Sequence, residues 1–111
     1  MYANTSKKCE IEWAGFDFSI RISELVKYLK SSDKGFPLSE RLLICGINIG
    51  LSCRKIGTNL DNDLVNDAIE LLTEADYIME MAVVGGYLTK QQGVHVRMDA
   101  IEIIKKLKEE L

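Results

Sequence analysis

The feature that most constrains the fold of this chain is an apolar stripe with heptad spacing in its third quarter. Its members alternate between large and small side chains, as closely packed helices require: Leu64, Ala68, Leu71, Ala75, Ile78 and Ala82. A second apolar row runs beside the first, over Val65, Ile69, Leu72, Met79 and Val83. The pattern predicts a helix over about residues 63–84, with a wide apolar face that other helices must cover.

Two more helices are predicted upstream of this stripe. Residues 17–31 place apolar side chains at three- and four-residue steps, at Ile22, Leu25, Val26 and Leu29. The next helix begins at Pro37, because proline is tolerated in a first helical turn, and it ends at Gly57. Before residue 16 no apolar period is sustained, so we expect an extended lead-in over residues 1–16.

A T-x-x-Q capping box, Thr89 to Gln92, opens a fourth helix after the Gly85-Gly86 stop. Its expected buried residues are Val94, Met98, Ile101, Ile104, Leu107 and Leu111. Four helices with short connections predict an all-α fold, an up-down-up-down antiparallel four-helix bundle over residues 17–111.

The second helix carries more apolar surface than one bundle face needs. One stripe is formed by Leu38, Leu42, Cys45, Ile49, Ser52 and Ile56, and another by Leu43, Ile47 and Leu51. A domain of 111 residues buries only about two-thirds of its unfolded surface. We therefore expect cover from the bundle itself or from another subunit. Gly46 and Gly50 would allow close approach where two helices cross.

Charge is distributed unevenly along the chain. The net charge is −3, from 14 Lys+Arg and 17 Asp+Glu. Residues 1–60 hold nine basic and six acidic side chains (+3), whereas residues 61–111 hold five and eleven (−6). Two interpretations are open: one half of a subunit pairs with the other half of a neighbour, or the acidic residues form a solvated face.

Catalytic, metal and membrane functions find no support in the sequence. The three cysteines, Cys9, Cys45 and Cys53, form no CxxC, and His95 is the one histidine, so neither a metal site nor a cofactor is expected. The acidic row Asp63, Asp67, Glu70 and Glu74 lacks the Glu-x-x-His partners of a di-iron bundle and is interpreted as a solvated stripe. We expect a non-enzymatic, cytoplasmic protein without a membrane span.

Basic side chains occur in small clusters that suggest nucleic-acid contacts. Lys27 and Lys30 lie near the end of the first helix, and Arg54 and Lys55 near the end of the second. In a cyclic oligomer each cluster is repeated, which would strengthen binding to phosphates. The other interpretation is dispersed, solubilising charge.

Three segments carry a resemblance to a known family. They are Gly35-Phe36-Pro37-Leu38-Ser39-Glu40-Arg41-Leu42, Asp67-Ala68-x-x-Leu71-Leu72, and the stretch from Ala82 to Gln92. They resemble the four-helix-bundle proteins encoded within 23S rRNA intervening sequences and their relatives, the accessory variability determinant (Avd) proteins of diversity-generating retroelements.

This resemblance implies a homopentameric ring without catalytic activity. For Avd relatives it also implies an accessory role, with a basic surface that binds a reverse transcriptase and RNA or DNA. The residues expected to make these contacts are Lys27, Lys30, Arg41, Arg54 and Lys55. The alternative is a structural module of the intervening-sequence type, which binds a protein through its acidic third helix and binds no nucleic acid.

Overall fold

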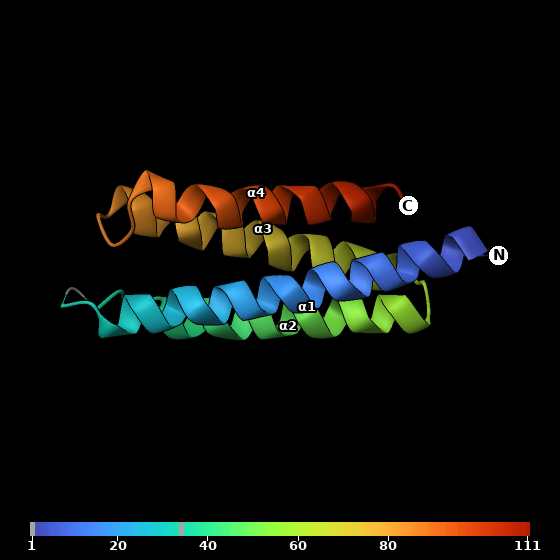
Figure 1. Ribbon diagram of the computed structural model, residues 1–111, viewed down its shortest axis with the longest axis horizontal. Helices are drawn as coiled ribbons and strands as arrows, with labels where there is room; N and C mark the ends of the chain where they lie inside the picture. The colour runs from blue at the N-terminus through green and yellow to red at the C-terminus, as the bar shows by residue number, and fades with distance from the viewer. Residues whose placement is uncertain (1, 34) are drawn as a thin grey trace.

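Four helices in sequence order make up the protein: α1 (Tyr2–Ser31), α2 (Ser39–Thr58), α3 (Asn62–Val84) and α4 (Lys90–Lys108). The computed structural model describes the backbone of residues 2–33 and 35–111, and the side chains from Cys9 on apart from residue 34. Each helix runs antiparallel to the one before it, and both termini lie at the same end of the bundle (Figure 1). The all-α, up-down-up-down architecture predicted from the apolar stripes is therefore confirmed.

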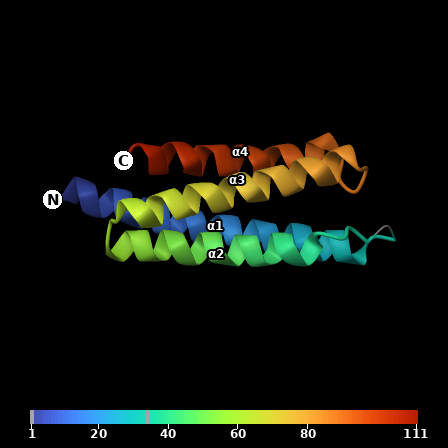
Figure 2. The same ribbon diagram turned by 180° about the vertical axis from the view of Figure 1, so that it is seen from behind.

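The helices form two layers, with α1 and α2 in one and α3 and α4 in the other (Figures 1 and 2). Each helix contacts the next one along the chain, and α4 contacts α1 to close the bundle. The two layers meet in an apolar core to which every helix contributes. Its largest fully buried side chains are Phe18, Ile22, Leu29, Leu42, Ile49, Ile56, Leu72, Met79 and Leu107.

The prediction of an extended lead-in over residues 1–16 is wrong, because α1 is helical from Tyr2; Met1 lies outside the described residues. Ile11, Gly15 and Phe18 are buried in steps of four and three, which continue the helical spacing of the later part of α1. Gly15 is a point of close contact with Cys53 of α2.

Glycines set the distance between α1 and α2. A Cβ at Gly15 would lie 2.4 Å from the Cβ of Cys53, and one at Gly46 would lie 2.7 Å from Ile22 Cγ2. At Gly50 it would lie 2.2 Å from the hydroxyl oxygen of Ser19, which donates to the Gly46 carbonyl at 2.7 Å. The predicted close crossing at Gly46 and Gly50 is therefore confirmed, with α1 as the partner helix.

The helices begin and end close to the predicted residues, because local capping interactions and glycines set their ends. The Thr89 hydroxyl accepts from the backbone N–H of Gln92 at 3.0 Å, and the Gln92 side chain accepts from the Thr89 N–H at 2.8 Å, so the predicted capping box is formed. Gly86 has a φ of 83°, a left-handed conformation that glycine adopts without strain after the end of α3. The second helix begins at Ser39, two residues later than predicted.

Replacement of Gly15 by alanine tests the close contact of α1 and α2. The added methyl group would meet the Cβ of Cys53, which cannot move without its backbone, so the helices must separate. We expect Gly15→Ala to lower the free energy of unfolding by about 1–3 kcal/mol in urea denaturation at fixed protein concentration.

The matched control is Asn48→Ala, at an exposed position of α2. Its free energy of unfolding should stay within about 0.5 kcal/mol of the parent value. Alanine has the higher helix propensity, by about 1 kcal/mol over glycine. A Gly15→Ala protein at least as stable as the parent would therefore show that the two helices do not need this glycine.

Candidate interaction surfaces

The five basic residues predicted as contacts do not form one patch. Lys27 and Lys30 are near the carboxyl end of α1 and Arg41 is in the first turns of α2, all at one end of the bundle. Arg54 and Lys55 are near the other end of α2, about 20 Å along the helix axis from Arg41. The structure therefore divides the predicted site into two clusters.

Three of these five side chains are engaged by carboxylates. Lys30 pairs with Glu40, Arg41 donates to Glu74 at 2.6 Å, and Arg54 lies 3.6 Å from Glu12. Arg54 also lies over the Phe16 ring, 5.7 Å from its centroid. The pairs are solvent-exposed, so each contributes little stability, but each reduces the local positive potential. Among the described residues, Lys27 and Lys55 have no ion-pair partner.

Glu74 was predicted to belong to a solvated acidic stripe on α3, but its carboxylate accepts a hydrogen bond from Arg41 of α2 and so connects the two helices. The hydrogen bond from Arg41 lowers the pKa of Glu74. Asp63, Asp67 and Glu70 are exposed on the same helix. No three His, Cys, Asp or Glu side chains within the described part of the chain are grouped so as to hold a metal ion. Among the described helices, none is long and apolar enough to cross a membrane.

Cys45 and Cys53 are core residues. The Cys45 thiol donates to the Leu71 carbonyl at 3.1 Å, and burial raises its pKa to about 12. Burial likewise raises the pKa of Cys53 to about 12. Both thiols are protonated near neutral pH and are not nucleophiles.

An apolar surface lies on the outside of the α1/α2 layer, and we call it the α1/α2 face. Its residues recur at i, i+3 and i+7 on each helix: Trp13, Phe16 and Ile20 on α1, and Ile44, Ile47 and Leu51 on α2. All six are classed as exposed. The second apolar stripe predicted for α2 is thus only partly covered by the bundle, since Leu43 is half-buried and Ile47 and Leu51 are exposed.

A second apolar surface, the α3/α4 face, lies on the other layer. Its residues recur at i, i+4 and i+7: Tyr77, Met81 and Val84 on α3, and Val94, Met98 and Ile101 on α4. The three α4 residues, together with Val83 and the stems of Lys90 and Arg97, line a groove of about 310 Å³. Arg97 is held there by Asp76 at 2.8 Å and Glu80 at 3.1 Å, and the bond to Asp76 raises its pKa.

The expected burial of Val94, Met98, Ile101 and Leu111 is wrong, because all four are exposed. The core side of α4 consists of Gly93, Val96, Ala100, Ile103 and Leu107. Both stripes have helical spacing, and the one toward the core has the smaller side chains. Gly93 shows why, since a Cβ there would lie 2.8 Å from Val83 Cγ2. Helix packing thus selects the small stripe, and the larger one faces outward.

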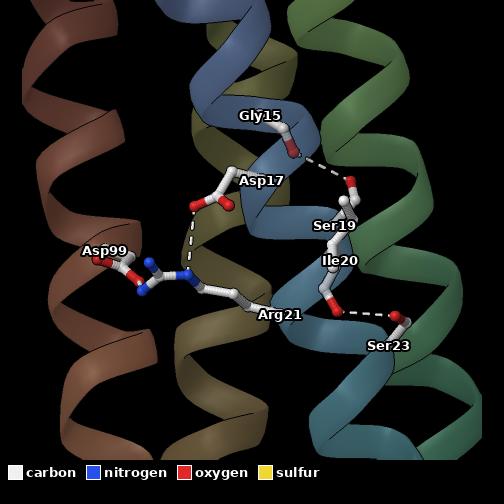
Figure 3. Close-up of polar contacts among 7 residues, drawn as sticks. All are labelled: Gly15, Asp17, Ser19, Ile20, Arg21, Ser23 and Asp99. Atoms are coloured by element: carbon white, nitrogen blue, oxygen red, sulfur yellow. Dashed lines mark hydrogen bonds and ion pairs between the residues drawn. The ribbon is translucent and has the colours of Figure 1, made fainter.

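Exposed ion pairs connect α4 with α1. The Arg21 guanidinium lies between Asp17 of its own helix, at 3.2 Å, and Asp99 of α4, at 2.6 Å (Figure 3). Lys106 of α4 pairs with Glu10 at 2.8 Å. These exposed pairs are compatible with the packed orientation of α4 and add little stability to it. In this orientation Met98 is exposed.

The fold and surface define a class: a compact up-down-up-down helical bundle with an unpartnered apolar face on each of its two layers. No model of a protein family and no curated protein matches the sequence. The chain is similar to the crystal structure of a protein of unknown function from the S23 ribosomal protein family of Bacteroides thetaiotaomicron. The TM-score is 0.86 and the identity 26%, over 95% of this chain and 94% of the other.

This structural neighbour supports the intervening-sequence side of the resemblance drawn from the sequence. The retroelement side stays a prediction.

Thiol chemistry tests the burial of Cys45 and Cys53. With a pKa of about 12, only ~10⁻⁴ of each thiol is ionised at pH 8, and both are covered by the core. Cys9 is exposed. With a thiol reagent at pH 8, we expect one thiol to react rapidly in the native protein and three to react after denaturation. In native Cys9→Ser, no thiol should react rapidly. Two or three fast thiols in the native parent protein would contradict the packing of α2.

Proposed function

We propose that the protein is a non-enzymatic interaction module that works as a homo-oligomer. The observation that carries the proposal is the pair of unpartnered apolar faces on opposite sides of the bundle. A monomeric protein seldom exposes two extended apolar surfaces, and such surfaces mark protein contacts. The S23-family neighbour has the same bundle over nearly all of its length, which supports a module of the intervening-sequence type.

The non-enzymatic part of the proposal is supported by the positions of the reactive side chains. Cys45 and Cys53 are protonated core thiols, and His95 is exposed on α4 away from both. A cytoplasmic location is part of the proposal, since the three cysteines are free thiols, the state expected where thiols are kept reduced. The subunit number of five is implied by the resemblance and belongs to the hypothesis.

The molar mass of the native protein tests self-association. We expect light scattering at micromolar concentration to give a multiple of the 12.5 kDa subunit mass, because assembly removes both apolar faces from water. Met98→Glu should lower this mass, since it places a charge in the α3/α4 face. The control His95→Glu adds the same charge at an exposed α4 position outside that stripe and should leave the mass unchanged.

A parent protein that stays at 12.5 kDa over the whole concentration range would overturn the proposal. Equal loss of mass in Met98→Glu and His95→Glu would assign the effect to charge in general, and so would also count against it.

The second candidate is an Avd-like accessory role, in which a ring binds a reverse transcriptase and its RNA or cDNA. The observation that favours it is that Lys27 and Lys55 are exposed and make no ion pair with any described residue. Lys27 and Lys55, repeated in an oligomer, would present charge at fixed spacing to a phosphate backbone.

An electrophoretic titration with a structured RNA tests this second candidate. We expect the parent protein to shift the RNA at low salt, and Lys55→Glu to weaken this binding. The slope of log affinity against log salt should fall by the equivalent of about one phosphate contact for each altered subunit that touches the RNA. Lys105→Glu makes the same charge change outside the predicted residues and is the control. Absence of a shift at low salt, or equal effects of the two variants, would exclude the role for Lys55.

A further inference from the structure

We infer that α4 is a releasable strap: it leaves the other three helices, unfolds and returns, in a local opening that does not require the whole bundle to unfold. While α4 is released the α3/α4 face does not exist, because Val94, Met98 and Ile101 belong to α4. The inference concerns a single copy of the chain and goes beyond the proposed self-association. Three features of the described residues support it: the burial on α4, its contact with α1, and its intrinsic helix stability.

The helix that contributes least to the buried core is α4. Among the described residues, the largest fully buried side chains include one from α4, Leu107, whereas each other helix supplies at least three. The rest of the core side of α4 consists of Gly93, Val96, Ala100 and Ile103. Stabilisation by burial grows with the apolar area removed from water, and glycine and alanine have little to bury. Burial therefore holds α4 less firmly than it holds the other helices.

The contact between α1 and α4 is the least extensive of the four contacts between neighbouring helices. Two grooves lie along it. One, of about 120 Å³, is lined by Phe18 and Ile103 among others, and the other, of about 440 Å³, by Leu25 and Val96 among others. Apolar atoms that border a groove lack contacts on that side, so the dispersion attraction between these two helices is incomplete.

The ion pairs between α1 and α4 do not compensate for this incomplete packing. Arg21 with Asp99 and Lys106 with Glu10 are exposed pairs, which contribute little because water and salt screen them. Arg21 also lies 3.2 Å from Asp17 of its own helix, so it keeps a carboxylate partner when Asp99 leaves (Figure 3). Release of α4 therefore leaves these charges in water, at little cost.

On its other side, α4 is joined to α3 by Arg97, which lies 2.8 Å from Asp76 and 3.1 Å from Glu80. These three side chains are between 27% and 53% exposed, so water can replace their contacts when α4 leaves. The two pairs lower the population of the released state, but they do not make release depend on unfolding of α1 and α2.

Once released, α4 does not persist as a helix. It contains Gly93, which lowers helix propensity, and β-branched residues, which lose rotamer freedom in a helix: Val94, Val96, Ile101, Ile103 and Ile104. Without tertiary contacts, a short helix is marginal in water even when it consists of better helix formers. The backbone N–H groups of α4 therefore exchange with solvent in the released state, which makes release measurable.

Hydrogen exchange of the full chain, followed by mass spectrometry of its peptides, tests the release. The protein is kept at the lowest practicable concentration, because a partner on the α3/α4 face would bind the docked state and suppress release. We expect residues 96–104 of α4 to be protected about 100-fold less than the middle of α1 and of α2, the equivalent of two fully buried apolar side chains.

Two conservative variants separate release of α4 from unfolding of the whole bundle. Ile56 is fully buried on α2 and stays covered after release, since α2 and α4 are not neighbours in the described bundle. Ile56→Val should therefore speed exchange in α1 and α2 roughly fivefold and leave exchange in α4 unchanged. The matched variant Ile103→Val removes the same group from α4 itself, and it should speed exchange in α4 by a similar factor.

Equal protection of all four helices in the parent protein would overturn the inference, and so would equal acceleration of α2 and α4 in Ile56→Val. The parent pattern decides the first point without any variant, and circular dichroism checks that both variants are folded. Light scattering of the parent protein decides self-association separately. A monomeric parent whose α4 exchanges through its own opening would uphold this inference and refute the proposed function.

Discussion

In a four-helix bundle, the neighbouring helices cover only the inner side of each helix. Apolar side chains on the outer side therefore stay exposed unless another molecule covers them. Each helix here carries apolar side chains on its core side and again on its outer side. At Gly15, Gly46 and Gly93, the inner contacts leave no room for a methyl group. These contacts fix which side of each helix faces the core, and the apolar residues of the other side, such as Met98 and Ile47, remain outward. The two apolar faces are thus a consequence of close helix packing.

Much of the fold could be predicted from the sequence, because it depends on local spacing and local chemistry. The stripe from Leu64 to Ala82 and the Thr89–Gln92 capping box identify α3, α4 and the turn between them. The first half of α1 could not be predicted in this way, since the residues before Phe16 show no sustained apolar period, and the burial of Gly15 depends on Cys53 of another helix. Which of two apolar stripes on α4 is buried depends likewise on Val83, which lies on another helix.

The candidate site was harder to predict than the fold, because charge clusters in a sequence do not reveal their partners. Lys30, Arg41 and Arg54 look available in the sequence, but each is paired with a carboxylate in the structure, and Glu74 lies 33 residues from Arg41. The apolar faces have a stronger signal in the sequence, because α2 carries more apolar stripes than one core side needs, but the sequence does not show which residues of α1, α3 and α4 lie beside them. The uneven charge of the two halves acquires a spatial meaning once each half is seen to form one layer.

The emission of Trp13 tests most directly whether the outer faces are covered. It is the single tryptophan of the chain, and it is 68% exposed in an isolated copy. If copies cover one another's faces, its fluorescence maximum lies at short wavelength at micromolar concentration and moves to longer wavelength on dilution, as the indole becomes hydrated. An emission maximum typical of a hydrated indole at every concentration would contradict the account.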